Sequence, residues 1–298
     1  MGSGGSRGDP WSFGPTELVG YQRAEFARAS VLRSWLIACQ FAIAMPGAAS
    51  VVVEDGVVLY FLAAAGTALL LLWLQLDRWY RSHRLAGERA RRATIVMQGL
   101  GTRISADEIF DLKGAFLVTP EAARSQRDSS YFASKAPAGY RRLAEMLEES
   151  AFWSETLQAA SAKAMGAFFG ALLAGGIIAA LAAVPFAESS AMMAGLRIFL
   201  AVLVFALSSD VLMAVRAHAQ AAREIKDIRT RLRVAEANGY TEADVLFLMS
   251  EYNAAVEAAP VVVPLAYRIK RAELNRRWSE YLEDRTAQGS SGGERDVA

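Results

Sequence analysis

The sequence has very few of the side chains that most catalytic, redox and metal sites use. Among its 298 residues there is one cysteine, Cys39, and there are two histidines, His83 and His218. A single cysteine excludes a disulfide within the chain, and a zinc site needs three or four Cys, His or carboxylate ligands. Nothing matches a P-loop, an HExxH helix or the strand–turn–helix context of a GxSxG elbow. We therefore expect a protein that is not an enzyme and that holds no metal and no cofactor.

Charged residues are missing from long stretches of the chain. Residues 34–53, 57–76 and 164–187 contain no Asp, Glu, Lys or Arg, and residues 190–215 contain only Arg197 and Asp210. A bilayer core of about 30 Å requires roughly 20 apolar residues in a helix. A soluble fold could bury one apolar hairpin, but this chain has too little other mass to cover four such segments. The pattern predicts four transmembrane helices in two hairpins, 34–76 and 164–215.

Positive charge is missing from the two short connections between these segments. The first connection is Glu-Asp-Gly at 54–56, and the second lies around Glu188. All Lys and Arg residues except Arg197 lie before the first segment, between 78 and 163, or from 216 onward. Because cytosolic loops carry the excess of Lys and Arg, we expect a multi-pass protein with both termini and the long middle segment in the cytosol.

The polar parts of the chain predict helices outside the membrane. We expect a flexible arm at 1–15 and a helix at 16–33 that either lies on the lipid headgroups or packs against the cytosolic part. Residues 77–163 and 216–286 predict cytosolic helical segments, and residues 287–298 a disordered tail. The expected fold class is all-α, with four transmembrane helices, three of which extend into a cytosolic helical bundle.

Three of the four apolar segments continue into polar sequence without a helix breaker. The second segment continues to about Met97, the third is preceded by a helix from about Tyr140, and the fourth continues to about Ala237. Residues 119–130 are polar and contain a proline, so they predict a loop. A rigid helix that crosses from the cytosol into the bilayer carries motion between the two.

Polar and small side chains inside the apolar segments have two interpretations each. Arg197 and Asp210 are about 20 Å apart along a helix and cannot pair within it; they either anchor the helix or belong to a polar pathway. Gly166, Gly170 and Ala174 form a row of small residues that permits close helix contact. That contact lies either within one chain or between the copies of a homo-oligomer.

Cationic and aromatic side chains occur together in two polar regions. Arginine suits phosphate recognition, and aromatic rings suit stacking on bases. A solvated helix face, or contact with lipid headgroups, accounts for the same composition. The candidate ligand-binding residues are Tyr131, Lys135, Arg141 and Arg142 in the first region, and Tyr252, Asn253, Arg268, Lys270 and Asn275 in the second.

The same regions carry a resemblance to a known family. The motifs are YFASKAPAGYRRLAEMLEESAFW at 131–153, SEYNAAVEAAPVVVPLAYRIKRAELNRRW at 250–278 and YQRAEFARAS at 21–30. They resemble the SMODS-associated four-transmembrane effector family of bacteria, over most of residues 20–285. The resemblance implies an antiphage effector of the bacterial inner membrane, which senses a cyclic nucleotide through its cytosolic part and permeabilises the membrane. It assigns no ligand residue.

Other functions remain open at this point. The chain could instead be a non-enzymatic membrane scaffold or signalling protein that recruits a cytosolic partner. A small transporter would need internal inverted repeats and several polar groups at mid-membrane, and the apolar segments offer few. The expected partners are the lipid bilayer, a cyclic nucleotide and further copies of the chain, and not duplex nucleic acid.

Overall fold

The described part of the chain folds into α-helices alone. The computed structural model describes residues 13–50, 53–183, 194–195, 197, 199 and 211–293. Within these residues no strand is formed, which confirms the all-α prediction. The helices are α1 (Pro15–Ser50), α2 (Gly56–Leu100), α3 (Ala106–Ala115), α4 (Pro120–Ser125), α5 (Tyr140–Ala183), α7 (Val211–Ala237), α8 (Glu242–Ala258) and α9 (Pro264–Gly293).

Three of these helices, α1, α2 and α5, are long and apolar enough to cross a membrane. The most apolar window of α2 has a mean hydropathy of 2.3, and none of it is buried inside the structure. An apolar surface exposed over this length is unstable in water and is matched by lipid. The chain therefore has the character of a membrane protein. The predicted fourth segment, 190–215, lies largely outside the described residues.

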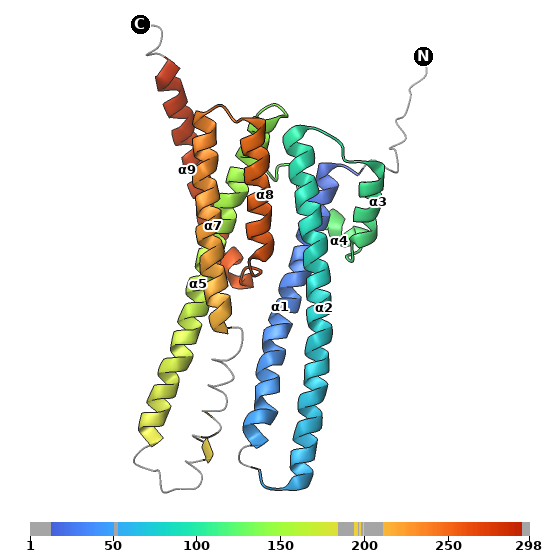
Figure 1. The fold of residues 1–298 in the computed structure, drawn as a ribbon, viewed down its shortest axis with the longest axis vertical. Coiled ribbons are helices and arrows are strands. Elements are labelled where there is room, and N and C mark those ends of the chain that lie inside the picture. Colours follow the sequence, from blue (N-terminus) through green and yellow to red (C-terminus); the bar gives the residue numbers. More distant parts are fainter. Residues whose placement is uncertain are drawn as a thin grey trace.

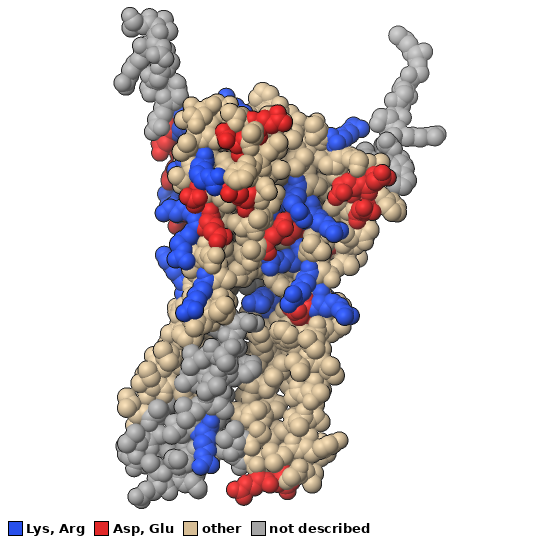
Figure 2. Space-filling view, viewed as in Figure 1, with Lys and Arg blue, Asp and Glu red and all other residues tan. Residues whose placement is uncertain are grey.

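The helices form two long pairs that share one charged end. Figure 1 shows α1 beside α2 and α5 beside α7, with α3, α4, α8 and α9 gathered at the end from which both termini emerge. Lys, Arg, Asp and Glu gather at this same end in Figure 2, and the described surface of the other end is almost uncharged. We call the charged end the head (13–33, 77–163 and 216–293) and the apolar end the stem (34–50, 53–76 and 164–183).

The core of the head lies between α2, α5, α7 and α8. Burying an aliphatic or aromatic side chain fully contributes about 1.5–3 kcal/mol, so this cluster is the main apolar stabilisation of the head. A second cluster joins α5 to α9 around Leu274 and Trp278. The main cluster includes Ile95 of α2, Leu143 and Leu147 of α5, Ile225 and Leu232 of α7, and Val245, Leu248 and Tyr252 of α8.

A close backbone approach fixes α2 against α5. A Cβ atom added to Gly99 would lie 2.9 Å from the Cα atom of Leu143, closer than real Cβ contacts come. The amide of Gly139 donates to the carbonyl of Gly99 at 2.8 Å, just before α5 begins. Gly101 ends α2 with a φ of 68°, a left-handed conformation that glycine adopts without strain.

Several helix ends agree with the sequence. Helix α2 continues past the second apolar segment to Leu100, and α5 runs from Tyr140 into the third segment without interruption. Helix α7 ends at Ala237, as predicted. Ser105 caps α3, since its Oγ atom accepts from the amide of Glu108 at 3.2 Å.

Other boundaries differ from the predictions for identifiable reasons. Helix α1 is continuous from Pro15 to Ser50 and packs against α2 and α4, so the predicted helix 16–33 is the first part of a longer one. Helix α4 lies inside the predicted loop 119–130, because Thr119 caps it and Pro120 occupies its first turn, where proline is favourable. Helix α9 extends to Gly293, into the predicted disordered tail 287–298.

Candidate functional site

Buried and half-buried polar side chains line the boundary between the two halves of the head, α1–α4 and α5–α9. We call them the polar seam. Arg91 of α2 donates from Nε to Glu88 at 2.7 Å, and its guanidinium carbon lies 5.2 Å from the centre of the Tyr252 ring on α8. The Tyr252 hydroxyl is 3.1 Å from Ser154 Oγ on α5. The seam consists of Gln22, Glu88, Arg91, Tyr131, Ser154 and Tyr252.

The seam contains hydrogen-bonding groups without partners. Arg91 is 7% exposed and Gln22 is 4% exposed. Among the described residues, neither Nη1 nor Nη2 of Arg91 has an acceptor, and Oε1 of Gln22 has no donor. Buried polar atoms are almost always paired, so unpaired ones point to water, an ion or a ligand. The two Nη atoms of a guanidinium form a fork that suits the oxygen atoms of a phosphate or carboxylate.

Tyr131 brings the segment between α4 and α5 into the seam. Its hydroxyl oxygen accepts from Nε2 of Gln22 at 3.0 Å. Burial raises the pKa of Tyr131 to about 12, and the neighbouring Tyr252 adds to the shift. The phenol is therefore uncharged at neutral pH and keeps its proton as a hydrogen-bond donor.

The structure brings together only part of the predicted ligand set. Tyr131 and Tyr252 lie in the seam, and Asn253 follows on α8 with its Oδ1 atom buried and without a donor among the described residues. The rest of the set lies elsewhere: Arg141 pairs with Glu145 on the surface, Lys270 pairs with Glu273, Arg142 is half-buried, and Lys135, Arg268 and Asn275 are exposed.

Sequence reasoning missed Arg91 and Gln22. Both lie in helices whose sequence resembles any surface helix, and their partners are distant along the chain. The one local signal is the i,i+3 pair Glu88–Arg91, which lies among the alanines of α2 and marks a face that is not apolar.

A second polar group surrounds the linker between α8 and α9, residues 259–263. Arg84 of α2 donates from Nη2 to the carbonyls of Glu257 and Ala259 at 2.6 and 2.5 Å, at the end of α8 where a helix attracts cations. Gln158 of α5 donates to the Pro260 carbonyl at 2.9 Å. We call this group the linker collar. It consists of Arg84, Gln158, Ser161, whose hydroxyl accepts from the amide of Val263, and His218, which contacts Gln158.

The linker itself contacts both halves of the molecule. Val261 packs against the α1–α2 cluster that contains Leu36, and Val262 packs against the α5–α9 cluster that contains Leu274. Burial lowers the pKa of His218 to about 4, with a smaller contribution from the Arg33 charge, so the imidazole is neutral at neutral pH. The collar therefore joins α2, α5, α7 and α8 directly above the stem.

Neither histidine belongs to a metal centre within the described residues. The Nδ1 atom of His83 lies 2.5 Å from Oε2 of Glu25, a buried carboxylate that also accepts from the amides of Leu117 and Val118. His218 contacts the Gln158 amide. The part of the chain that the structure describes contains no group of three metal-ligating side chains.

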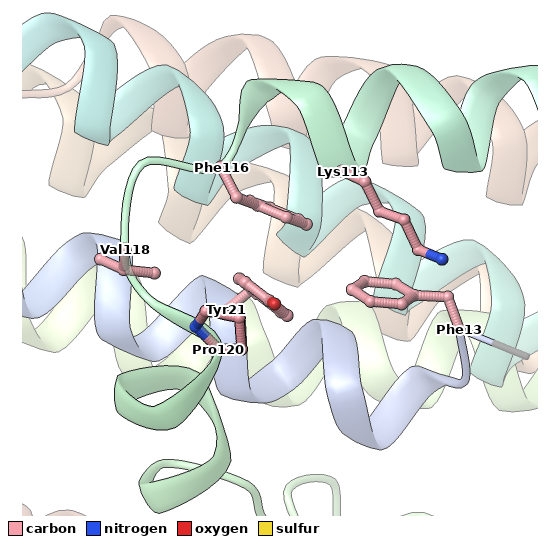
Figure 3. Close-up of a pocket in the computed structure, with 6 residues that line it drawn as sticks. All are labelled: Phe13, Tyr21, Lys113, Phe116, Val118 and Pro120. Atoms are coloured by element: carbon pink, nitrogen blue, oxygen red, sulfur yellow. The ribbon is translucent and has the colours of Figure 1, made fainter. Parts of the chain in front are cut away.

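A half-open aromatic pocket lies at the start of α1, beside α3. Figure 3 shows the Tyr21 ring beneath that of Phe116 and the Lys113 ammonium group beside Phe13. The ring centres of Tyr21 and Phe116 are 4.2 Å apart, and Nζ of Lys113 is 4.8 Å from the centre of Phe13. The cavity of about 330 Å³ is lined by Phe13, Tyr21, Lys113, Phe116, Val118 and Pro120. The rings contact one another, so they act first as packing for the α1–α3 junction.

The structure describes all but one of the small and charged residues that were singled out in the apolar segments. A Cβ atom added to Gly166 would meet Val215 of α7 at 3.9 Å, whereas one added to Gly170 would meet nothing within 4 Å. Ala174 is exposed, so the small-residue row begins against α7 and continues on an open face. Arg197 is exposed, and Asp210 lies outside the described residues.

The comparisons with known proteins return no match. No family model, no curated protein and no solved structure matches the chain.

Proposed function

We propose that the protein is an effector of the bacterial inner membrane, which binds a cyclic nucleotide signal in its head and then permeabilises the membrane through its stem. In this proposal the chain crosses the bilayer four times, as hairpins 34–76 and 164–215, of which the stem is the described part, and the head and both termini are cytosolic. The antiphage role follows from the resemblance of residues 131–153 and 250–278 to the four-transmembrane effector family. Copies of the chain would meet along the open small-residue face of α5.

The observation that carries the proposal is the continuity of helices between head and stem. Helices α1, α2 and α5 each contain both an apolar segment and a part of the head, with no break between them. A helix is stiff over this length, so a change in packing in the head moves the apolar segments too. A ligand that binds one arrangement of the head better than another shifts the population of stem arrangements.

The polar seam supplies a chemically suitable place for such a ligand. A phosphate group offers acceptors to the unpaired Nη atoms of Arg91, and the neutral hydroxyl of Tyr131 offers a further donor. The seam lies between the two halves of the head. A ligand bound there would contact both α2 and α8 and would change the angle between the halves.

Leakage of dye from reconstituted vesicles tests the proposal. We expect at least one member of a panel of cyclic di- and trinucleotides to bind the protein and to release the dye. The Arg91→Gln variant should lose binding and release, while Arg89→Gln, an exposed neighbour on α2, should keep both. Failure of every nucleotide to cause release would contradict the effector function.

A variant of the collar separates binding from release. Arg84→Gln removes a cation from the end of α8 and leaves the seam unchanged. We expect nucleotide binding within about threefold of the wild type and a clear loss of dye release, because the link from α8 to α2 is weakened. Circular dichroism and gel filtration of each variant show that it is folded. If the Arg84→Gln variant lost both nucleotide binding and dye release, the collar would not have a purely transmitting role.

Exposed apolar side chains on the head favour a second candidate function, a non-enzymatic scaffold that recruits a cytosolic partner. Phe110 is 67% exposed, Phe247 58% and Val234 57%. Aromatic side chains are enriched at protein–protein interfaces relative to the rest of the surface. Under this function, a Phe247→Ser variant would lose a specific partner in co-purification, and the wild type would release no dye with any nucleotide.

A further inference from the structure

Each long helix carries a cation where the head meets the stem. Arg33 directly precedes the apolar part of α1, and Arg78 follows the apolar part of α2. Lys163 directly precedes the apolar part of α5, and Arg216 lies in the first two turns of α7, next to the fourth apolar segment. We call these four residues the cationic belt. Figure 2 shows Lys and Arg side chains gathered at this junction on the face in view.

The four cations lie at one level along the long axis. The Arg33 guanidinium carbon is 6.0 Å from the centre of the Tyr80 ring, and Arg78 lies two residues from Tyr80 on α2, so Arg33 and Arg78 are within about one helical turn of each other along the axis. Gly166 faces Val215, which places Lys163 about one turn from Arg216.

A contact between two aromatic rings relates the positions of the two helix pairs along the long axis. The ring centres of Phe41 on α1 and Phe168 on α5 are 6.1 Å apart. At 1.5 Å per residue, Arg33 lies about 12 Å from Phe41 and Lys163 about 8 Å from Phe168, on the head side of both. The belt is therefore a band about one helical turn deep.

The belt cations lack acidic partners. Arg78, Lys163 and Arg216 are exposed, and no ion pair joins any belt residue to an acid among the residues that the structure describes. Some exposed cations further into the head are paired, as Arg141 is with Glu145 and Arg276 with Glu280, whereas others, such as Arg89, Arg103 and Lys226, have no ion pair within the described part of the chain but do not adjoin the apolar stem. The belt thus has an unneutralised positive charge beside a long apolar surface.

We propose that the cationic belt is a binding surface for the headgroups of anionic phospholipids, such as phosphatidylglycerol and cardiolipin. A headgroup phosphate supplies the missing negative charge, while its acyl chains cover the apolar stem directly below. Trp35 and Trp79, 62% and 50% exposed, lie at the same level, as aromatic side chains at a lipid interface do. A free phosphate ion would meet the cations but not the apolar surface, so the observations favour the lipid. This inference depends on the proposed insertion of the stem into a bilayer.

The acidic turn at the opposite end of the stem confines the preference for anionic lipid to the leaflet beside the belt. Among the described residues of the turn itself, 53–56, Glu54 and Asp55 are charged and neither is a cation; Arg197, which is also described and exposed, belongs to the other apolar hairpin. A negatively charged headgroup is repelled at that turn and attracted at the belt. The belt therefore recruits anionic lipid to the leaflet that faces the head.

Quenching of tryptophan fluorescence by brominated lipids tests the inference. The full-length protein is reconstituted in mixtures of phosphatidylcholine and phosphatidylglycerol, with bromine on one lipid at a time, so that lipid beside Trp35 and Trp79 is measured. We expect brominated phosphatidylglycerol to be preferred, by about fivefold for each cation at low salt, and the preference to weaken at high salt. Soluble glycerol phosphate should not compete.

A matched pair of triple variants completes the experiment. Arg78→Gln, Lys163→Gln and Arg216→Gln together should abolish most of the preference. Arg89→Gln, Arg103→Gln and Lys226→Gln, three exposed cations of the head, should leave it unchanged. Equal quenching by both lipids in the wild type, or an unchanged preference in the belt variant, would overturn the inference and leave membrane insertion standing. Absence of quenching by either lipid would overturn the membrane proposal itself.

Discussion

Buried carboxylates hold the head together at the scale of single residues. Glu148 of α5 is 2% exposed and accepts from Tyr281 at 2.6 Å, Arg285 at 3.0 Å and Arg233 at 3.1 Å. Its charge is fully neutralised, and it connects α5 to α7 and α9. The next residue, Glu149, is buried, and among the described residues its one hydrogen-bond donor is the amide of Ala133 at 2.8 Å. Adjacent carboxylates on one helix therefore have opposite environments.

Glu149 predicts a pH dependence of stability in the neutral range. Burial raises the pKa of Glu149 from 4.5 to about 7, partly offset by the Ala133 hydrogen bond. Between these values the folded state holds a proton that the unfolded state has lost, so stability falls as the pH rises from about 4.5 to about 7 and is constant above. The loss is about 3 kcal/mol. Thermal unfolding of the detergent-solubilised protein, followed by tryptophan fluorescence, measures it.

Two variants check that the effect belongs to Glu149. The Glu149→Gln variant should show a nearly flat unfolding temperature between pH 5 and pH 7.5, because the amide does not titrate. Glu145→Gln, one turn away on α5 and paired with exposed Arg141, should keep the wild-type slope. An unchanged slope in Glu149→Gln would assign the pH dependence to another group.

At the scale of helices, local signals in the sequence predict the ends of elements well. Asp55, Ser105 and Thr241 each cap the helix that follows, and Gly101 and Gly239 follow helix ends with positive φ. Such signals involve residues within a few positions of one another, so a sequence displays them.

The polar seam and the linker collar could not be predicted in this way. Arg91 meets Tyr252, and Arg84 meets the carbonyl of Ala259, across separations that only the packing of four helices establishes. Composition identified Tyr131 and Tyr252 as candidates but not the buried arginine between the halves. The predicted ligand set included the exposed residues Arg268 and Asn275, because charge and aromatic content do not distinguish an exposed helix face from a buried boundary between helices.

The close contact between α2 and α5 predicts that one methyl group added at Gly99 strongly lowers the stability of the fold. Gly99→Ala places a Cβ atom against the backbone of Leu143, and we expect a loss of about 2–3 kcal/mol, because backbone atoms cannot move aside cheaply. Gly114→Ala on α3 is the matched control: no atom lies within 4 Å of its added Cβ. That change should leave stability unchanged or raise it by up to about 1 kcal/mol. Thermal unfolding of both variants at one pH compares them.

At the scale of the whole molecule, the separation of charge predicts a topology that labelling can measure. In a Cys39→Ala background, Glu54→Cys puts a thiol at the far turn of the stem, and Lys135→Cys puts one on the head; both positions are exposed. We expect a membrane-impermeant maleimide to label the first variant in intact spheroplasts and the second only in inside-out vesicles. Labelling of Lys135→Cys in intact spheroplasts would reverse the proposed orientation.

Under the proposed function, the position of Arg84 along α2 would make the linker collar the pivot of a tilting helix. At 1.5 Å per residue, Arg84 lies about 24 Å from Leu100 and about 42 Å from Gly56. A stiff rod that tilts about this point moves its longer arm by nearly twice the displacement of its shorter arm. If the proposed ligand tilts α2 about this point, a small displacement at the top of the head would become a displacement nearly twice as large at the tip of the stem.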